Sequence, residues 1–182
     1  QFAVVGIALL WIYFRAHERF FRFRNTLIVA NLIGLVGYVL LPTAPPRMFP
    51  DFGFVDTLAK VGGLWSFDDS AMAKVSNQYA AMPSMHTGWS TWCAFVLVPM
   101  FRRRWAKVLM ALYPAATVFC IMITANHYWL DALGGAAVLA LGWWGVREVM
   151  GGARTGDLIA ILVLIPISTA VYGGILWALR VE

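Results

Sequence analysis

The chain has 182 residues, of which 61% are hydrophobic and 13% are charged, and its formal net charge is +5. Soluble domains carry roughly 45–50% apolar and about 25% charged residues, so a soluble fold is excluded. The positive charge does not indicate a nucleic-acid-binding protein, because basic residues at cytoplasmic helix ends orient membrane proteins. No segments alternate with period two, which excludes a β-barrel. The composition indicates a helical integral membrane protein.

Six apolar segments predict an all-α bundle of six transmembrane helices, forming a single domain over residues 1–182. The first segment is short for a span, and because the chain begins with Gln1 we expect a truncated N-terminus. The third is also short, so its helix is expected to start near Pro83. The segments run approximately over 1–14, 26–42, 88–101, 106–125, 128–149 and 158–178.

The connection between the second and third segments, residues 43 to 86, is rich in Phe, Trp and Leu. Such a segment is expected to lie in the membrane interface, partly as short amphipathic helices. The stretch "DDSAMAKVSNQYAAMP" (68–83) is one candidate helix, with Asp68 or Asp69 near its start. A covering loop and a lid over a lipid site predict the same composition.

Basic residues orient the predicted bundle. Ten of the 14 lie in alternate connections, namely 15–24, 102–107 and the region of Arg147 and Arg154. This side is expected to face the cytoplasm. The 43–86 connection and the turn near residue 126 then lie on the extracytoplasmic side of the plasma membrane. His86 and His127 are therefore predicted to share that face.

His127 and Asp131 are four residues apart at the start of the fifth segment. If the helix has started by residue 127, the two side chains share a face and can touch. A carboxylate beside one ring nitrogen fixes the tautomer and leaves the other nitrogen as a directed nucleophile or base. The same spacing also suits a helix-end pair that only satisfies two polar groups.

His86 favours the chemical interpretation, because attack on phosphorus by one histidine needs a partner that protonates the departing oxygen. Ser84 and the amides at the helix start could hold phosphate oxygens. Arg47 could make a bidentate phosphate contact, or serve as an interfacial anchor. Lys60 and Lys74 are weaker candidates that could equally be solvated or touch lipid headgroups.

Three segments, "PTAPPR" (42–47), "AAMPSMHTGW" (80–89) and "NHYWLDALGG" (126–135), occur in this order. They resemble the three signature segments of the type 2 phosphatidic acid phosphatase superfamily, most closely its inositol phosphorylceramide synthase-like branch. The resemblance implies a six-helix core.

The resemblance also implies a role for each matching residue. His127 would be the nucleophile that forms a phosphohistidine, and Asp131 would orient it. His86 would protonate the leaving group and afterwards deprotonate the acceptor. Arg47 and Ser84 would bind phosphate, and no metal or other cofactor is expected, since basic side chains and amides stabilise the developing charge.

Two positions depart from the phosphatases. Met85 replaces a glycine before the histidine of the second segment, and Ile121 replaces an arginine six residues before His127. Arg47, Asn126 or a lysine of the outer connection such as Lys74 must then supply the phosphate contacts. The loss of that arginine argues against a simple phosphatase.

The sequence therefore predicts a metal-independent membrane lipid phosphatase or phosphotransferase. Its partners would be a lipid phosphate or phosphodiester, membrane lipids and an acceptor, either water or an alcohol such as inositol or a sugar. A proton-coupled or lipid transport or binding protein is the alternative, but it predicts ionisable groups near mid-span, whereas these candidates gather at one end. A zinc hydrolase using His86, His127 and Asp131 is a third interpretation.

Overall fold

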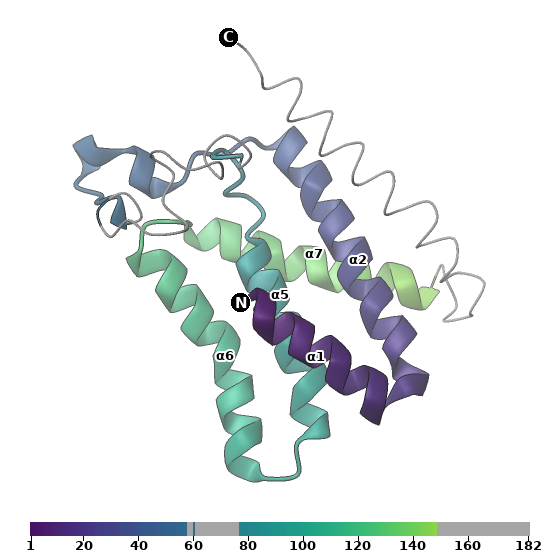
Figure 1. Cartoon of the computed structure of the whole chain (residues 1–182). Helices are drawn as coiled ribbons and strands as arrows, with labels where there is room; N and C mark the ends of the chain where they lie inside the picture. The colour runs from purple at the N-terminus through teal and green to yellow at the C-terminus, as the bar shows by residue number, and fades with distance from the viewer. Residues whose placement is uncertain (58–59, 61–76, 149–182) are drawn as a thin grey trace.

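The computed structural model describes residues 1–57, 60 and 77–148, and the regular elements within these ranges are helical (Figure 1). Extended pairing in the same ranges is confined to an isolated bridge between Thr43 and Ala80. The elements are α1 (Phe2–Arg15), α2 (His17–Leu40), η1 (Pro46–Met48), η2 (Pro50–Phe52), α5 (Met85–Leu97), η3 (Val98–Met100), α6 (Arg104–Ile123) and α7 (Trp129–Glu148).

The long helices of the described part occupy the positions of the first five predicted spans, which confirms the all-α prediction there. The sixth predicted span, 158–178, lies outside the described residues. By length and composition, α2, α6 and α7 can cross a membrane, and α1 is a shorter apolar helix. α5 has 13 residues, so the third helix is short, as predicted.

The arginine-rich stretch after α1 was predicted to be a connection, and this prediction is wrong. Only Ala16 separates α1 from α2, so Arg19, Arg22 and Arg24 belong to the first two turns of α2. Long basic side chains can extend along an apolar helix surface while their charged heads stay in water. The Arg24 guanidinium, for example, lies 5.1 Å from the ring centroid of Phe21.

The outer connection is partly helical, as predicted, because η1 and η2 lie within it. Its two ends are joined where Thr43 donates to the Tyr79 carbonyl and accepts from the Ala81 amide, at 2.9 and 3.2 Å. The predicted 68–83 helix is not seen in residues 77–83, which form turns and bends, and residues 68–76 lie outside the described part. This pairing brings the end of the outer connection close to its beginning, just before the start of α5.

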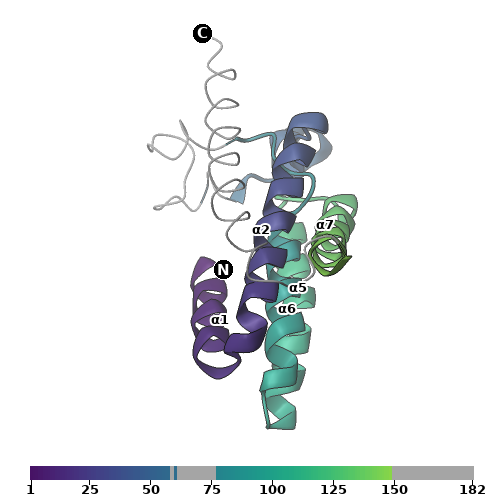
Figure 2. The ribbon, with the colours of Figure 1, turned by 90° about the vertical axis from the view of Figure 1, so that its right-hand side faces the viewer.

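α5 lies at the centre of the described bundle and packs against α1, α2, α6 and α7 (Figures 1 and 2). Trp92 is fully buried, and its indole nitrogen donates to the Phe23 carbonyl of α2 at 3.0 Å. Ile12 of α1 and Val96 of α5 belong to the same apolar cluster. Pro99 follows directly within η3, where a proline cannot continue the hydrogen-bonding pattern of the helix. Burial on several sides explains why so short a helix is stable here.

α7 crosses the other helices steeply: Figure 2 shows it nearly end-on while α2 runs along the vertical. Two of its glycines permit this crossing. A Cβ at Gly142 would lie 3.0 Å from the backbone nitrogen of Ala30 in α2. A Cβ at Gly135 would overlap the carbonyl oxygen of Ser84 and lie 3.3 Å from the Gly88 nitrogen. The obstructing atoms at Gly135 are backbone atoms, so a side chain there would push α5 and α7 apart.

Substitution of this glycine tests the crossing. Gly135→Ala should lower the free energy of unfolding by about 1–3 kcal/mol, because an overpacked contact must be relieved by moving backbone. Gly145→Ala on the same helix is the matched control, since nothing lies within 4 Å of its Cβ position, and replacement of a helical glycine gains up to about 1 kcal/mol. Thermal unfolding in detergent should show a lower midpoint for the first variant only; equal midpoints would contradict the close approach.

Candidate active site

The C-terminal ends of α2 and α6 meet the N-terminal ends of α5 and α7 at one end of the bundle (Figure 1). Pro83, just before α5, packs against Gly37 of α2. The Ser84 amide donates to the Asp131 carbonyl of α7 at 2.8 Å. These contacts place the second and third signature segments side by side, although they are about 40 residues apart in the sequence.

The two predicted histidines are in direct contact. Nδ1 of His86 lies 3.2 Å from Nε2 of His127, with the ring centroids 5.3 Å apart. One nitrogen must carry the shared proton and the other must accept it, so the contact links the two tautomers. His127 is 5% exposed and His86 is exposed. The pair therefore combines a buried ring with an exposed one.

Asp131 lies beside the other nitrogen of His127. Its Oδ2 is 3.5 Å from Nδ1 of His127 and accepts the Tyr128 amide at 2.8 Å. Within the described residues, Nδ1 of His127 is buried without a hydrogen-bond partner. The carboxylate is thus within ion-pair range but outside hydrogen-bond geometry, and such bonds often tighten when substrate binds.

The route to this contact differs from the prediction. α7 begins at Trp129, so His127 precedes the helix and does not share a helical face with Asp131. Asp131 is instead the third helical residue, and its side chain accepts the amide of Tyr128, the residue that precedes the helix. This is one half of a capping box. The same carboxylate therefore caps α7 and faces His127.

His127 is positioned from the other side by the end of α6. The Asn126 and Ala125 amides donate to the carbonyls of Ile121 and Met122, each at 3.0 Å. This is a Schellman motif, which normally places glycine where Ala125 stands with φ 54°. An alanine in the left-handed region costs about 1 kcal/mol. The His127 amide also donates to Ile121, so the tight turn holds the backbone of the histidine.

Arg47 reaches the same turn. Its amide donates to the Ala125 carbonyl at 2.9 Å, and its Nη1 donates to Oδ1 of Asn126 at 2.7 Å. Its Nε lies 3.7 Å from Oδ2 of Asp56. Burial lowers the pKa of Arg47 and the Asp56 carboxylate acts in the opposite direction, so the guanidinium stays charged at neutral pH. The three signature segments are thus joined at one place.

The other predicted phosphate ligands are placed differently. Asn126 uses its oxygen on Arg47, and its amide nitrogen donates to Thr124 at 2.8 Å. Ser84 is fully buried, and its hydroxyl accepts from the Thr87 amide at 3.5 Å as the N-cap of α5. Lys74 lies outside the described residues. Lys60, the other lysine candidate, is exposed, and its amide donates to the Asp56 carbonyl at 3.2 Å. Arg47 is the positively charged candidate that bonds to the turn before His127.

The two departures from the phosphatase pattern have structural counterparts. Met85 fits beside Gly34 of α2, where a Cβ would lie 2.7 Å from the methionine sulfur. Ile121 is 7% exposed and supplies the carbonyl that caps α6. Asp56 is a residue that the sequence analysis missed. A carboxylate in a mostly apolar connection was the available signal, but only the fold shows that it faces Arg47.

The three residues considered for zinc do not converge on one point. His127 faces His86 with one ring nitrogen and Asp131 with the other, so the groups lie in series. Across the ranges that the structure describes, no group of three His, Cys, Asp or Glu side chains is arranged to hold a metal ion. The arrangement suits instead proton transfer at one histidine and attack by the other, with the carboxylate beside the attacking ring.

Comparisons with known proteins agree with the motifs. The family profile described as the PAP2 superfamily matches residues 1–145. A phosphoinositol dihydroceramide synthase from Bacteroides thetaiotaomicron is 30% identical over 159 residues, covering 78% of this chain and 52% of the relative, so the chain spans about half of that protein's length. No solved structure matches. The resemblance to the synthase-like branch is confirmed, and the chain is an integral membrane protein.

Variants of Asp131 should distinguish its role as the cap of α7 from the effect of its negative charge. Asp131→Asn keeps an oxygen for the Tyr128 amide and removes a 1% exposed carboxylate, whose burial is costly without full pairing. We expect its thermal midpoint in detergent to equal or exceed that of the wild type. Asp131→Ala loses the acceptor and should be destabilised by about 1–2 kcal/mol. If the Asn variant is as unstable as the Ala variant, the negative charge itself holds the fold.

Proposed function

The chain belongs to the PAP2 superfamily, and on this premise we propose that it is a membrane lipid phosphatase or phosphotransferase that works through a phosphohistidine on His127. The observation that carries the proposal is the line of His86, His127 and Asp131, with nitrogen–nitrogen and nitrogen–oxygen distances of 3.2 and 3.5 Å. In this line one ring can attack phosphorus while the other supplies a proton.

In the first step, Nε2 of His127 attacks phosphorus and the bond to the leaving oxygen breaks. Asp131, beside Nδ1 of the same ring, stabilises the positive charge that the ring gains. His86 gives its proton to the departing oxygen, so the leaving group departs as an alcohol. The phosphoryl group is then carried on His127, and it keeps its headgroup ester when the substrate is a phosphodiester.

In the second step, His86, now without its proton, takes a proton from the acceptor, and the acceptor oxygen attacks the phosphohistidine. The nitrogen–phosphorus bond breaks and both histidines return to their starting forms. Water as the acceptor gives hydrolysis, and an alcohol gives transfer. An imidazole ring can both donate and accept a proton, so the same side chain can serve both transfers.

The direct contact of the two nitrogens leaves no space for a phosphorus atom between them. Substrate entry must therefore open the pair. His127 is held by the turn after α6 and by burial, whereas His86 is exposed at the first turn of α5. We infer that the His86 ring rotates away and that the phosphate takes its place beside Nε2 of His127.

Arg47 is the proposed contact for the phosphate oxygens, with Asn126 as the positioning residue that fixes its guanidinium. The amides at the start of α5 are a second candidate contact, and Ser84 supports them as the N-cap. Because Ile121 stands where the phosphatases have an arginine, Arg47 also takes over part of that charge.

The charge balance favours a phosphodiester over a phosphomonoester. Arg47 has Asp56 close by, and the buried Asp131 adds a further negative charge. A phosphate monoester carries about −1.5 to −2 near neutral pH, whereas a diester carries a single negative charge. The name of the bacterial relative contains phosphoinositol and dihydroceramide, and we take an inositol phospholipid donor and a dihydroceramide hydroxyl acceptor as the first pair to test. The active site is proposed to face the extracytoplasmic side.

The nucleophile is tested by trapping and by product analysis. Purified protein is incubated with phosphatidylinositol labelled at phosphorus, with and without dihydroceramide, and with labelled phosphatidic acid. We expect acid-labile label on the wild-type protein and a labelled product, with transfer exceeding hydrolysis when the acceptor is present. His127→Ala should lose the protein-bound label and at least about 10⁴-fold of turnover, because no other group replaces the nucleophile.

His17→Ala is the matched control, since His17 lies at the far end of α2 and packs against Phe21 with ring centroids 5.4 Å apart. It should retain both label and turnover. Unchanged turnover in His127→Ala, in protein with a wild-type unfolding midpoint, would remove the covalent scheme. Absence of any turnover of these lipids by the wild type would remove the proposed substrate class.

The proton donor is tested through the leaving group. His86→Ala should slow release of diacylglycerol by about 10²–10⁴-fold, because an alkoxide needs a proton to depart. With a p-nitrophenyl phosphodiester, whose leaving group is a weak base, the first step should slow by less than about tenfold. Single-turnover release of p-nitrophenolate measures that step alone. Equal losses on both substrates would show that His86 is not the acid of the first step.

A further inference from the structure

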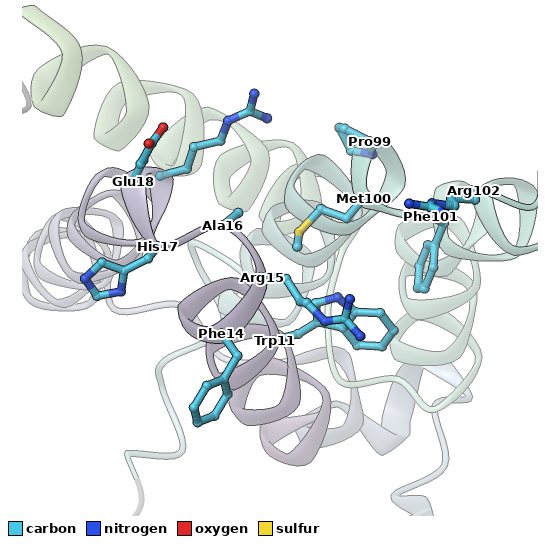
Figure 3. Close-up of a pocket in the computed structure, with 11 residues that line it drawn as sticks. Trp11, Phe14, Arg15, Ala16, His17, Glu18, Pro99, Met100, Phe101 and Arg102 are labelled. Carbon is cyan, nitrogen blue, oxygen red and sulfur yellow. The ribbon is translucent and has the colours of Figure 1, made fainter.

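A pocket, drawn in Figure 3, lies at the start of α2, away from the starts of α5 and α7 that carry the histidine site (Figure 1). It is a pocket of about 960 Å³ between the α1–α2 turn and the segment that leads from η3 into α6. α5 and η3 separate His86 from Met100 of this pocket by 14 residues, a length of about 21 Å. The pocket therefore has no direct part in the chemistry at His127.

Three arginines gather around this pocket from two separate parts of the chain. Arg15 and Arg19 come from the α1–α2 turn, and Arg102 comes from the opposite wall. Glu18 is the acidic residue among the lining side chains, so the lining keeps a net positive charge. The end of α1 and the start of α2 meet at this turn, and their opposed helix dipoles offset each other. The side chains therefore decide the potential, and it favours an anion.

Apolar side chains complete the walls. Trp11 and Phe101 make an edge-to-face contact with centroids 5.6 Å apart, which joins α1 to the loop after η3. Met100 lies on the same wall as Phe101 and Arg102 (Figure 3). Phe14 and His17, also drawn there, point away from that wall. Cationic heads beside aromatic and thioether surfaces match a ligand with an anionic head and an apolar body.

We propose that this pocket binds the headgroup of an anionic phospholipid, with the phosphate between Arg15, Arg19 and Arg102 and the acyl chains along the outer surface of α1. The exposed face of α1, which includes Phe14 at 76% and Leu10 at 61% exposure, gives those chains an apolar path. Basic pockets between membrane helices are known sites for anionic headgroups. A free phosphate ion shares the head chemistry but does not use this apolar surface.

The test uses the full chain and a matched loss of charge. Arg15→Gln, Arg19→Gln and Arg102→Gln are combined in one variant. A control combines Arg103→Gln, Arg104→Gln and Lys107→Gln, which removes the same charge from the start of α6 without altering the pocket lining. Binding of dioleoylphosphatidylglycerol is titrated by native mass spectrometry in a neutral detergent. Dioleoylphosphatidylcholine and inorganic phosphate form the other arms.

The wild type and the control variant should bind phosphatidylglycerol saturably and in preference to phosphatidylcholine. The pocket variant should bind it on the order of 100-fold more weakly, because each basic contact contributes to anionic lipid binding. Equal weakening in both variants would show general attraction to a basic surface and overturn the proposal. Full competition by inorganic phosphate would assign the site to the free ion. Unfolding midpoints show whether either variant has lost its fold.

Discussion

Direct contact between the backbones at the starts of α5 and α7 is the constraint on which the site depends. The Ser84 amide bonds to the Asp131 carbonyl at 2.8 Å, and Gly135 lies against the Ser84 carbonyl where any side chain would collide. At this separation the short reach of an imidazole is enough for His86 to touch His127. The glycine is therefore part of the site, although it bears no reacting group.

The site has a buried half and an exposed half. His127 lies between two helix termini, since the Schellman motif of α6 holds its backbone and the cap of α7 places Asp131 beside its ring. His86 stands on the first turn of α5 with an exposed ring. A nucleophile gains from fixed geometry, because its orbital must point at phosphorus. A proton donor that serves first a leaving group and then an acceptor gains from limited freedom.

The sequence was sufficient for the features that depend on local patterns. Apolar segments located the helices of the described part, and the alternation of basic connections predicted that His86 and His127 reach the same end. It failed at two element boundaries and at the contacts between distant segments. The start of α7 at Trp129, where Asp131 caps the helix, and the inclusion of Arg19 in α2 were not predicted. The pairing of Arg47 with Asp56 and Asn126 links segments up to 79 residues apart, which no local pattern contains.

The two ends of the described bundle treat anions in different ways. At the arginine end, Arg15, Arg19 and Arg102 line one pocket and are exposed, so positive charge can accumulate there at small desolvation cost. At the histidine end, the Arg47 side chain is largely buried and its charge is offset by Asp56. A site that binds the phosphate of the substrate as tightly as that of the transition state does not speed the reaction. In the proposed mechanism, stabilisation must grow as the phosphorus centre becomes crowded. We expect that growth to come from the proton that His86 would transfer and from the positive charge that Asp131 would balance. The weak ground-state charge at this site is therefore consistent with turnover of a singly charged diester.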